Sequence, residues 1–241
     1  MKPVPQDIPV FVAEKDCAAL VDLGLSEYRA TYELQVALVD RRKEGSCEDI
    51  FLVTEHPSVF TLGRRGGREN LVVSEQFLKE KKISLVHIER GGDITYHGEG
   101  QLVLYPVIDL RARGLAVTEY VFLLEEIMIR LAAVYGVDTG RDPRNHGVWV
   151  GDRKLGSVGI AIRHGISFHG LALNVNLALE PFSWVNPCGL SGVKMTSLQQ
   201  EAGRGLVETG DVKKKLKEIL GNLFQLDFQE YPKEWLYGRM C

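Results

Sequence analysis

Cys188 is the residue whose setting most clearly suits chemistry, because it lies in the loop sequence N-P-C-G-L rather than on a periodic apolar face. A cysteine attacks as a thiolate, and the free thiol has a pKa of about 8.5, so a neighbouring group must favour the anion. Such a thiolate would serve covalent catalysis. The alternative interpretation is an inert loop cysteine.

A glycine-rich stretch could supply the wall of a pocket. Residues 90–106 read R-G-G-D-I-T-Y-H-G-E-G-Q-L-V-L-Y-P, and four glycines fall within the first eleven positions. Glycine lets the backbone approach a ligand closely or take a positive φ. The alternating apolar run that follows predicts a strand, so a glycine loop leads directly into the core. A glycine-rich hairpin without a ligand is the alternative.

Apolar periodicity predicts the elements that must position these residues. Strands are expected at Val10 to Ala13, Val21 to Leu23, Ile50 to Thr54, Val59 to Leu62, Leu85 to Ile88, Leu102 to Ile108, Gly147 to Val150, Lys154 to Arg163 and Ile166 to Val175. Helices are expected from the N-cap Ser26 to Gly45, from Ser74 to Lys82, from the N-cap Thr118 to Gly136, and from Asp211 onwards; Pro181 to Gly192 is expected to be a loop.

The last three predicted strands form an antiparallel meander. Gly151 and Asp152 between the first two are a two-residue hairpin signal. This places Lys154 at the start of a strand, next to the turn. An exposed hairpin lysine is ordinary, so its position alone assigns it no role.

Other polar residues near the expected pocket have two interpretations each. Arg64, Arg65 and Arg68 lie among three glycines in the segment 63–68. We favour a solvated turn there, and the alternative is a basic lip for an acidic partner. His97 and His169 each lie beside a glycine in an expected pocket wall. Substrate positioning and a purely structural role remain open for both.

Composition excludes several classes of function. The chain has 241 residues, 45% of them hydrophobic, a formal charge of -3 and a pI near 6.1, which argues against nucleic-acid binding by bulk charge. We expect one domain over residues 1–241, with no membrane-spanning run and no signal peptide. The four cysteines and six histidines match no metal spacing. A reduced, cytoplasmic protein without a metal is therefore expected.

Four motifs in order carry a family resemblance: the glycine stretch at residues 90–106, K-L-G-S-V-G, F-H-G-L-A-L-N-V and N-P-C-G-L. With the earlier E-H-P-S-V-F-T-L-G-R, they resemble the lipoyl(octanoyl)transferase family from about Leu23 to Leu198. The resemblance implies an α+β fold, with a mixed, largely antiparallel sheet flanked by helices, like the biotin/lipoyl protein ligase catalytic domain.

The resemblance also implies a reaction. The family transfers an octanoyl group from acyl carrier protein to a lysine of lipoyl domains. These domains belong to 2-oxoacid dehydrogenases or are the glycine-cleavage H protein. We expect no cofactor and no nucleic-acid or membrane partner. The family's acyl-thioester cysteine falls on Cys188, and the lysine that lowers its pKa falls on Lys154. The family's substrate-binding positions fall on Arg90, Gly91, Gly92, Asp93, Ile94, Thr95, Tyr96, His97, Ser157, Val158, Gly159, Gly170, Leu171 and Ala172.

Small residues on the predicted strands are consistent with an acyl slot. Gly156, Ser157, Gly159, Gly170 and Ala172 would leave room for an eight-carbon chain. Two departures from the family pattern concern the substrate wall: Glu99 stands where proline is frequent, and Leu-Gly-Ser follows the lysine where Ile-Ala-Ala is common. Rival functions are an ATP-dependent ligase of the same fold, a non-catalytic carrier-binding module and a cysteine hydrolase. A ligase that forms an adenylate would leave the cysteine unexplained.

Overall fold

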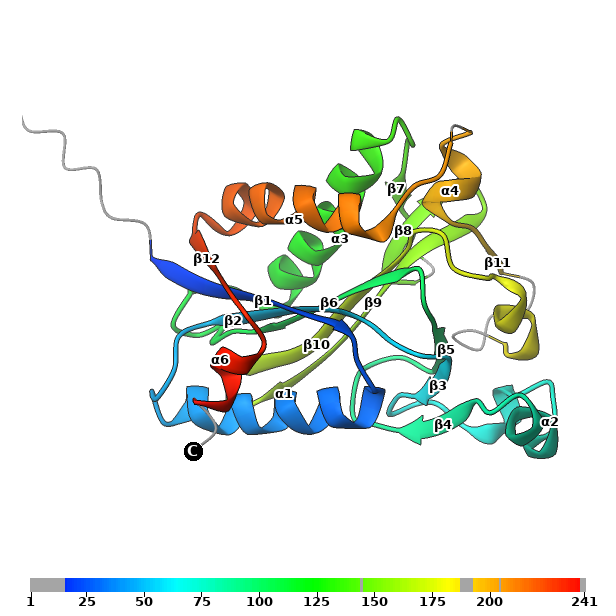
Figure 1. The fold of residues 1–241 in the computed structure, drawn as a ribbon, viewed down its shortest axis with the longest axis horizontal. Helices are drawn as coiled ribbons and strands as arrows, with labels where there is room; N and C mark the ends of the chain where they lie inside the picture. Colours follow the sequence, from blue (N-terminus) through cyan, green and yellow to red (C-terminus); the bar gives the residue numbers. More distant parts are fainter. Residues whose placement is uncertain (1–15, 144, 187–192, 204, 239–241) are drawn as a thin grey trace, which may run out of the picture.

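A large mixed β-sheet with helices on both faces forms most of the fold (Figure 1). The computed structural model describes residues 16–143, 145–186, 193–203 and 205–238. The strands of the large sheet are β1 (Cys17–Leu25), β2 (Ile50–Glu55), β6 (Gln101–Val107), β7 (Gly140–Arg141), β8 (Gly147–Val150), β9 (Arg153–Arg163), β10 (Ile166–Asn174), β11 (Lys194–Met195) and β12 (Asp227–Tyr231). A smaller sheet contains β3 (Val59–Leu62), β4 (Ser84–His87) and β5 (Ile94–His97). The helices are α1 (Tyr28–Lys43), α2 (Glu75–Glu80), α3 (Val117–Val134), α4 (Leu198–Glu201), α5 (Thr209–Phe224) and α6 (Glu234–Tyr237), with 3-10 turns η1 (Arg68–Asn70) and η2 (Glu180–Trp184).

Most strand pairings in the large sheet are antiparallel. Within the described parts of the chain, the order is β12-β1-β2-β6-β10-β9-β8-β7, and β11 also pairs with β9. Strand β1 is parallel to both of its neighbours, and β11 is parallel to β9. The pairings from β2 to β7 along this order are antiparallel. The predicted mixed, largely antiparallel sheet flanked by helices is confirmed, including the meander of β8, β9 and β10.

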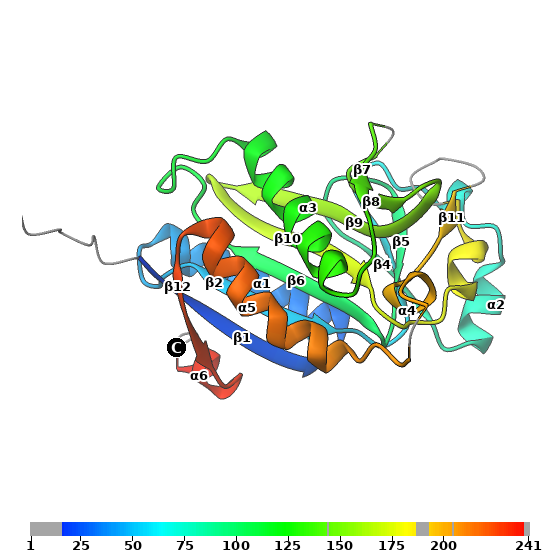
Figure 2. The same cartoon turned by 90° about the horizontal axis from the view of Figure 1, so that it is seen from above.

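Helices α3 and α5 lie side by side over one face of the sheet, and α1 covers the other (Figures 1 and 2). Successive residues of a strand point to opposite faces. In β6, Leu102 and Leu104 therefore pack with α3 and α5, whereas Val103 and Tyr105 pack on the α1 side. The predicted apolar stripe of the helix after Thr118 enters the first of these cores. Both faces of β6 and β10 are buried as a result.

Two helices begin at other residues than predicted. Glu27, not Ser26, is the N-cap of α1, because its carboxylate accepts a hydrogen bond from the Ala30 N–H at 2.9 Å. Helix α3 begins at Val117, which puts Thr118 inside the first turn. The Glu119 side chain reaches back to the Ala116 N–H at 2.8 Å, so a carboxylate satisfies the exposed backbone group in both helices.

Several strands differ from the prediction. Strand β1 runs the length of Cys17–Leu25, well beyond Val21 to Leu23. Strand β12 was not predicted, because D-F-Q-E-Y at the sheet edge buries only Phe228. The 3-10 turn η2 replaces the first part of the predicted loop Pro181 to Gly192. The predicted strand Val10 to Ala13 lies outside the described residues.

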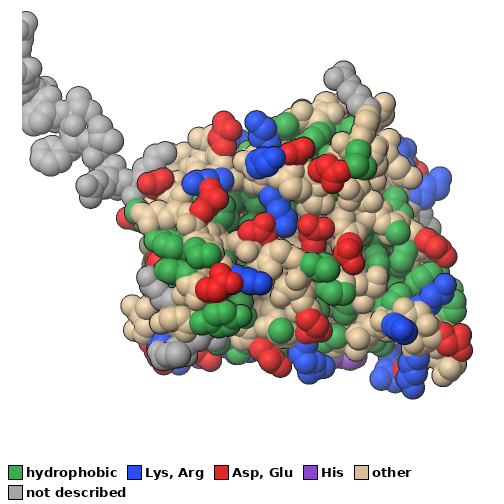
Figure 3. Space-filling view, viewed as in Figure 1, with side chains coloured by type: hydrophobic (Ala, Val, Ile, Leu, Met, Phe, Trp, Pro, Cys, Tyr) green, Lys and Arg blue, Asp and Glu red, His purple; other side chains and the backbone are tan. Residues whose placement is uncertain are grey.

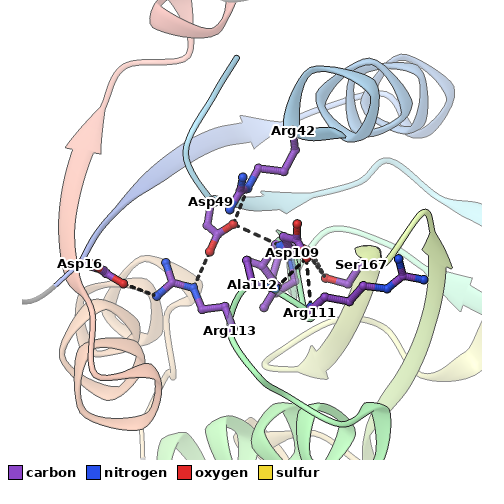
Figure 4. Close-up of polar contacts among 10 residues, drawn as sticks. Asp16, Arg42, Asp49, Asp109, Arg111, Ala112, Arg113 and Ser167 are labelled. Atoms are coloured by element: carbon purple, nitrogen blue, oxygen red, sulfur yellow. Dashed lines mark hydrogen bonds and ion pairs between the residues drawn. The ribbon is translucent and has the colours of Figure 1, made fainter. Parts of the chain in front are cut away.

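A buried carboxylate ties three elements together at one end of the sheet (Figure 4). Asp49, just before β2, accepts from the Nε of Arg42 at the end of α1 at 2.7 Å and from the Nε of Arg113 at 2.6 Å. Its side chain is 0% exposed, and it also accepts from the Asp109 N–H at 3.2 Å. One carboxylate therefore joins the helix to the loop after β6. Among the helices that the structure describes, none has the length and apolar character to span a membrane.

Candidate active site

A cavity of about 650 Å³ lies beside β9 and β10, under the glycine loop of residues 90–93. Its other walls come from β5, the start of α1, two residues of β6, helix α3 and residues 141–143, 145 and 146. This volume is within the range of small-molecule sites. The cavity therefore has room for a small-molecule substrate.

The glycine loop lies directly on β9. The Gly91 N–H donates to the Ile160 carbonyl at 2.8 Å. A Cβ at Gly159 would stand 3.2 Å from both Arg90 Cδ and the Gly91 carbonyl oxygen, so glycine at 159 allows the loop to approach this strand. Gly92 has φ +88°, a conformation that side chains oppose. The close contact of loop and strand forms the cavity wall that the motif predicted.

Arg90 brings a permanent cation to this wall. Its side chain is almost fully buried and donates to the Thr61 carbonyl at 2.6 Å, to Thr61 Oγ1 at 2.8 Å and to the Gly91 carbonyl at 3.1 Å. A guanidinium stays protonated in proteins. These bonds orient it and connect the glycine loop to β3 of the small sheet.

The small residues of β9 and β10 serve two different purposes: some line the cavity, and Gly156 makes room for a helix. Ser157 pairs with Ala172 and Gly159 with Gly170, and all four line the cavity. Gly156 does not line the cavity, because its Cα faces helix α3. A Cβ at this position would lie 2.5 Å from the sulfur of Met128. The expectation that Gly156 makes room for substrate is wrong. It allows a helix to pack instead.

Lys154 lies in the cavity wall, 3% exposed, at the second position of β9. Its ammonium donates to Asn145 Oδ1 at 3.0 Å and lies 5.4 Å from the ring centroid of Trp149. Met195 of β11 pairs with Lys154, so residues 194–195 lie against this strand. Cys188 itself lies outside the described residues.

His97 also lines the cavity, and its ring is held on both sides. Its Nδ1 is 2.7 Å from Gln101 Oε1, and its Nε2 is 3.4 Å from Thr61 Oγ1. Burial holds the pKa of this imidazole well below 6.5, so the ring is neutral near pH 7. These bonds favour the structural interpretation for His97 over direct chemistry.

Nearly all of the predicted site residues meet at this cavity. Those that line it are Arg90, Gly91, Gly92, Asp93, Ile94, Thr95, His97, Lys154, Ser157, Val158, Gly159, Gly170, Leu171 and Ala172. Among the predicted site residues that the structure describes, Tyr96 is the exception. It packs in the core of the small sheet, with its ring centroid 5.3 Å from that of Phe60, and its hydroxyl is 2.9 Å from Ser58 Oγ.

Sequence reasoning missed the part of the cavity wall that helix α3 supplies. Glu125 of α3 is buried there, 3.0 Å from the Nε of Arg141, and it accepts from the Gly147 N–H at 3.0 Å. Its signal was a carboxylate next to Leu124 in the apolar stripe of the helix, since a buried charge usually has a specific partner. Tyr28 lines the cavity from the first turn of α1 without any comparable signal.

Comparisons with known proteins identify the family of this chain. The family model of the lipoyl protein ligase A/B catalytic domain matches residues 27–221. The chain is 58% identical over 208 residues to an octanoyltransferase of Desulfotalea psychrophila, covering 85% of this chain and 93% of that protein. It is 42% identical over 213 residues to an octanoyltransferase of Syntrophobacter fumaroxidans, covering 88% and 93%.

Solved structures share the fold. A bi-partite lipoate protein ligase from Thermoplasma acidophilum has a TM-score of 0.71 at 18% identity, covering 94% of this chain and 91% of that one. A lipoate-protein ligase A bound with ATP has a TM-score of 0.69 at 17% identity, covering 94% and 92%. At these identities the solved structures support the fold alone. The family match and the octanoyltransferase relatives also support the family and the class of enzyme. The chain belongs to the lipoyl protein ligase A/B catalytic domain family and is an acyltransferase of the octanoyltransferase kind.

Proposed function

We propose that the chain transfers an octanoyl group from acyl carrier protein to a lysine of a lipoyl domain, through a thioester on Cys188. The observation that carries this proposal is the buried ammonium of Lys154 in the wall of a cavity large enough for an acyl chain. A cation held in such a place stabilises a thiolate beside it. Lipoyl domains of 2-oxoacid dehydrogenases and the glycine-cleavage H protein are the acceptors that the family resemblance implies.

In the first half-reaction, the Cys188 thiolate attacks the carbonyl carbon of the carrier thioester. The new C–S bond forms as the bond to the carrier's pantetheine sulfur breaks, and the Lys154 ammonium gives its proton to that sulfur. The acyl group stays activated as a thioester, and Lys154 is left as a neutral amine. The reaction therefore has a ping-pong order.

In the second half-reaction, the amine of the acceptor lysine attacks the thioester carbonyl. The C–N bond forms as the C–S bond to Cys188 breaks, and Lys154 takes the proton that the attacking nitrogen loses. This restores the pair of thiolate and ammonium. An amide product is more stable than the thioester, so the second step favours transfer.

Intact mass after exposure to octanoyl-carrier alone tests the covalent step. The protein should gain one octanoyl unit that hydroxylamine removes, and Cys188→Ser should gain none. Cys17 is exposed and Cys47 is buried, so Cys17→Ser and Cys47→Ser serve as controls and should keep the adduct. An adduct on either of these two cysteines would contradict the assignment.

A transfer assay with a lipoyl domain separates the proposed function from an ATP-dependent ligase of the same fold. Transfer from octanoyl-carrier should proceed without ATP. Free octanoate with ATP should give no modified domain. Modification that requires ATP would favour the ligase, and carrier binding without either reaction would favour a non-catalytic module.

A further inference from the structure

His169 has a backbone conformation and a lack of partners that the reaction above does not explain. It is 1% exposed and lines the cavity, and both of its ring nitrogens are without a hydrogen-bond partner among the described residues. Its φ is +56° in the middle of β10. A buried polar group without a partner costs stability, and so does a left-handed residue within a strand.

The cause of this conformation is the proline on the neighbouring strand. Leu171 pairs with Leu104, and the Ser167 N–H donates to the Ile108 carbonyl, so His169 stands opposite Pro106 in the same register. Proline has no N–H to give to the ladder. The His169 N–H donates instead to Oε1 of Gln35 on α1, at 2.8 Å.

This local distortion turns the imidazole to the other face of the sheet. Leu171 and Leu173, which share its parity in β10, point to the core under α3 and α5. The ring of His169 instead stacks on Tyr32 of α1, with centroids 5.8 Å apart and planes 9° apart. The proline, the glutamine and the left-handed residue together place the imidazole against α1, where it lines the α1 side of the cavity.

The register of β10 against β9 gives the distance of His169 from the ammonium of Lys154, the end of the cavity where we propose that the reaction takes place. Gly147 pairs with Ser157, and a Cβ at Gly147 would lie 2.9 Å from Lys154 Cε, so the end of the Lys154 side chain lies near Ser157. His169 pairs with Ile160, three positions further along. Three strand residues span about 10 Å. An extended eight-carbon chain is roughly 9 Å long, given C–C bonds of about 1.5 Å.

We propose that His169 is a specificity-determining residue that closes the inner end of the acyl channel, so that the channel accepts chains of about eight carbons. The proposal rests on the proposed octanoyl transfer at the same cavity. It also extends the substrate class, because the ring offers hydrogen bonds to a hydroxyl at or near the last carbon of the chain. Burial lowers the pKa of this imidazole to about 3, so near pH 7 the neutral ring has one donor and one acceptor.

His169→Asn tests the length limit. Asparagine tolerates a left-handed backbone and is shorter, so it opens the inner end without adding strain. The ratio of decanoyl to octanoyl transfer, as kcat/KM from acyl carrier protein, should rise roughly tenfold, the gain for two newly buried methylenes. His164→Asn is the matched control, because His164 also has φ +56° but is exposed in the turn after β9. It should leave the ratio unchanged.

His169→Phe tests the hydrogen bond, since it keeps a ring of similar size without nitrogens. The ratio of 8-hydroxyoctanoyl to octanoyl transfer should fall about tenfold relative to wild type, because the hydroxyl loses its partner. Thermal unfolding checks that both variants fold. If His169→Phe does not fold, His169→Asn alone tests the length limit. Octanoyl transfer that proceeds with unchanged ratios in the asparagine variant would overturn the role of His169. Absence of any octanoyl transfer in wild type would instead overturn the proposed function.

Discussion

At the scale of single residues, the site combines a buried cation with neutral imidazoles. Lys154 keeps its ammonium near Asn145 and Trp149, while burial holds the pKa values of His97 and His169 low. In the proposed reaction Lys154 exchanges the proton with the thiol, so that reaction requires no histidine base. This distinguishes the proposed reaction from that of a cysteine hydrolase, which usually relies on a histidine.

Lys154→Ala should slow both half-reactions by about a hundredfold or more, because it removes thiolate stabilisation and the proton carrier together. Lys154→Arg keeps the positive charge but does not release a proton at working pH, so it should restore thiolate without restoring turnover. Iodoacetamide alkylation across pH, in a Cys17→Ser background because Cys17 is exposed, measures the thiolate. Transfer rates measure turnover.

Lys194→Ala is the control for the two Lys154 variants, because Lys194 is exposed on β11, the strand that pairs with β9. It should change neither the alkylation midpoint nor the transfer rate. An alkylation midpoint of Lys154→Ala equal to wild type would show that Lys154 does not tune the thiol. Full transfer by Lys154→Arg would exclude its role as proton carrier.

At the scale of elements, local patterns predicted where most helices and strands lie, whereas features that depend on distant parts of the chain were missed. The stripe from Val121 to Ala132 and the turn at Gly151 depend on neighbours in sequence, and both were predicted. The ring of His169 depends on Pro106, 63 positions earlier, which no local period reveals. The edge strand β12 is held by β1 at the opposite end of the chain.

The site follows the same division. Family motifs predicted the walls made by the glycine loop, β9 and β10, because those residues are contiguous in sequence. They did not predict Glu125 and Tyr28, which reach the cavity only through helix packing. Tyr96 does not line the cavity, because it packs against Phe60 and Phe182 in the core of the small sheet.

The buried Asp49 should stabilise the junction of α1, β2 and the loop after β6. Asp49→Ala leaves the Arg42 and Arg113 guanidiniums facing each other without their anion. We expect a loss of roughly 2–4 kcal/mol in the free energy of unfolding, less than for a fully buried pair because both arginines keep some contact with water. Urea unfolding measures it.

Asp16→Ala is the matched control, since Asp16 is 82% exposed in its side chain and meets the same arginine at 3.3 Å. It should cost less than about 0.5 kcal/mol. Octanoyl transfer by the folded Asp49→Ala protein should stay near wild type, because the junction lies outside the cavity lining. A loss below about 1 kcal/mol would show that the junction is dispensable.

At the scale of the whole molecule, charge is mixed rather than polarised. Basic and acidic side chains intermingle over the face shown in Figure 3, and the formal net charge is -3. Attraction of an acidic carrier must then be local. The arginine lip, defined as Arg64, Arg65 and Arg68, is the candidate.

The structure attaches this lip to the site. The Arg64 N–H donates to the Arg90 carbonyl at 3.0 Å, and the Arg65 N–H donates to the Gly92 carbonyl at 3.2 Å. Arg65 lines the cavity, whereas Arg68 is ion-paired with Glu75 at 2.5 Å. Arg64 and Arg65 therefore place exposed charge at the edge of the cavity, where an acidic carrier delivering its arm would arrive.

Reversing both charges, as Arg64→Glu with Arg65→Glu, should raise KM for octanoyl-carrier at least about tenfold, because like charges would oppose docking. The increase in KM should become smaller as the salt concentration rises, because salt screens interactions between exposed charges that lie more than about 8 Å apart at 0.15 M. Transfer from octanoyl-pantetheine, a small uncharged donor, should stay near wild type. Lys214→Glu with Lys217→Glu makes the same net change on α5, away from the cavity, and should leave both donors unaffected. If the double arginine variant lost the same factor in transfer rate with both donors, the arginines would act inside the acyl site and not on the carrier.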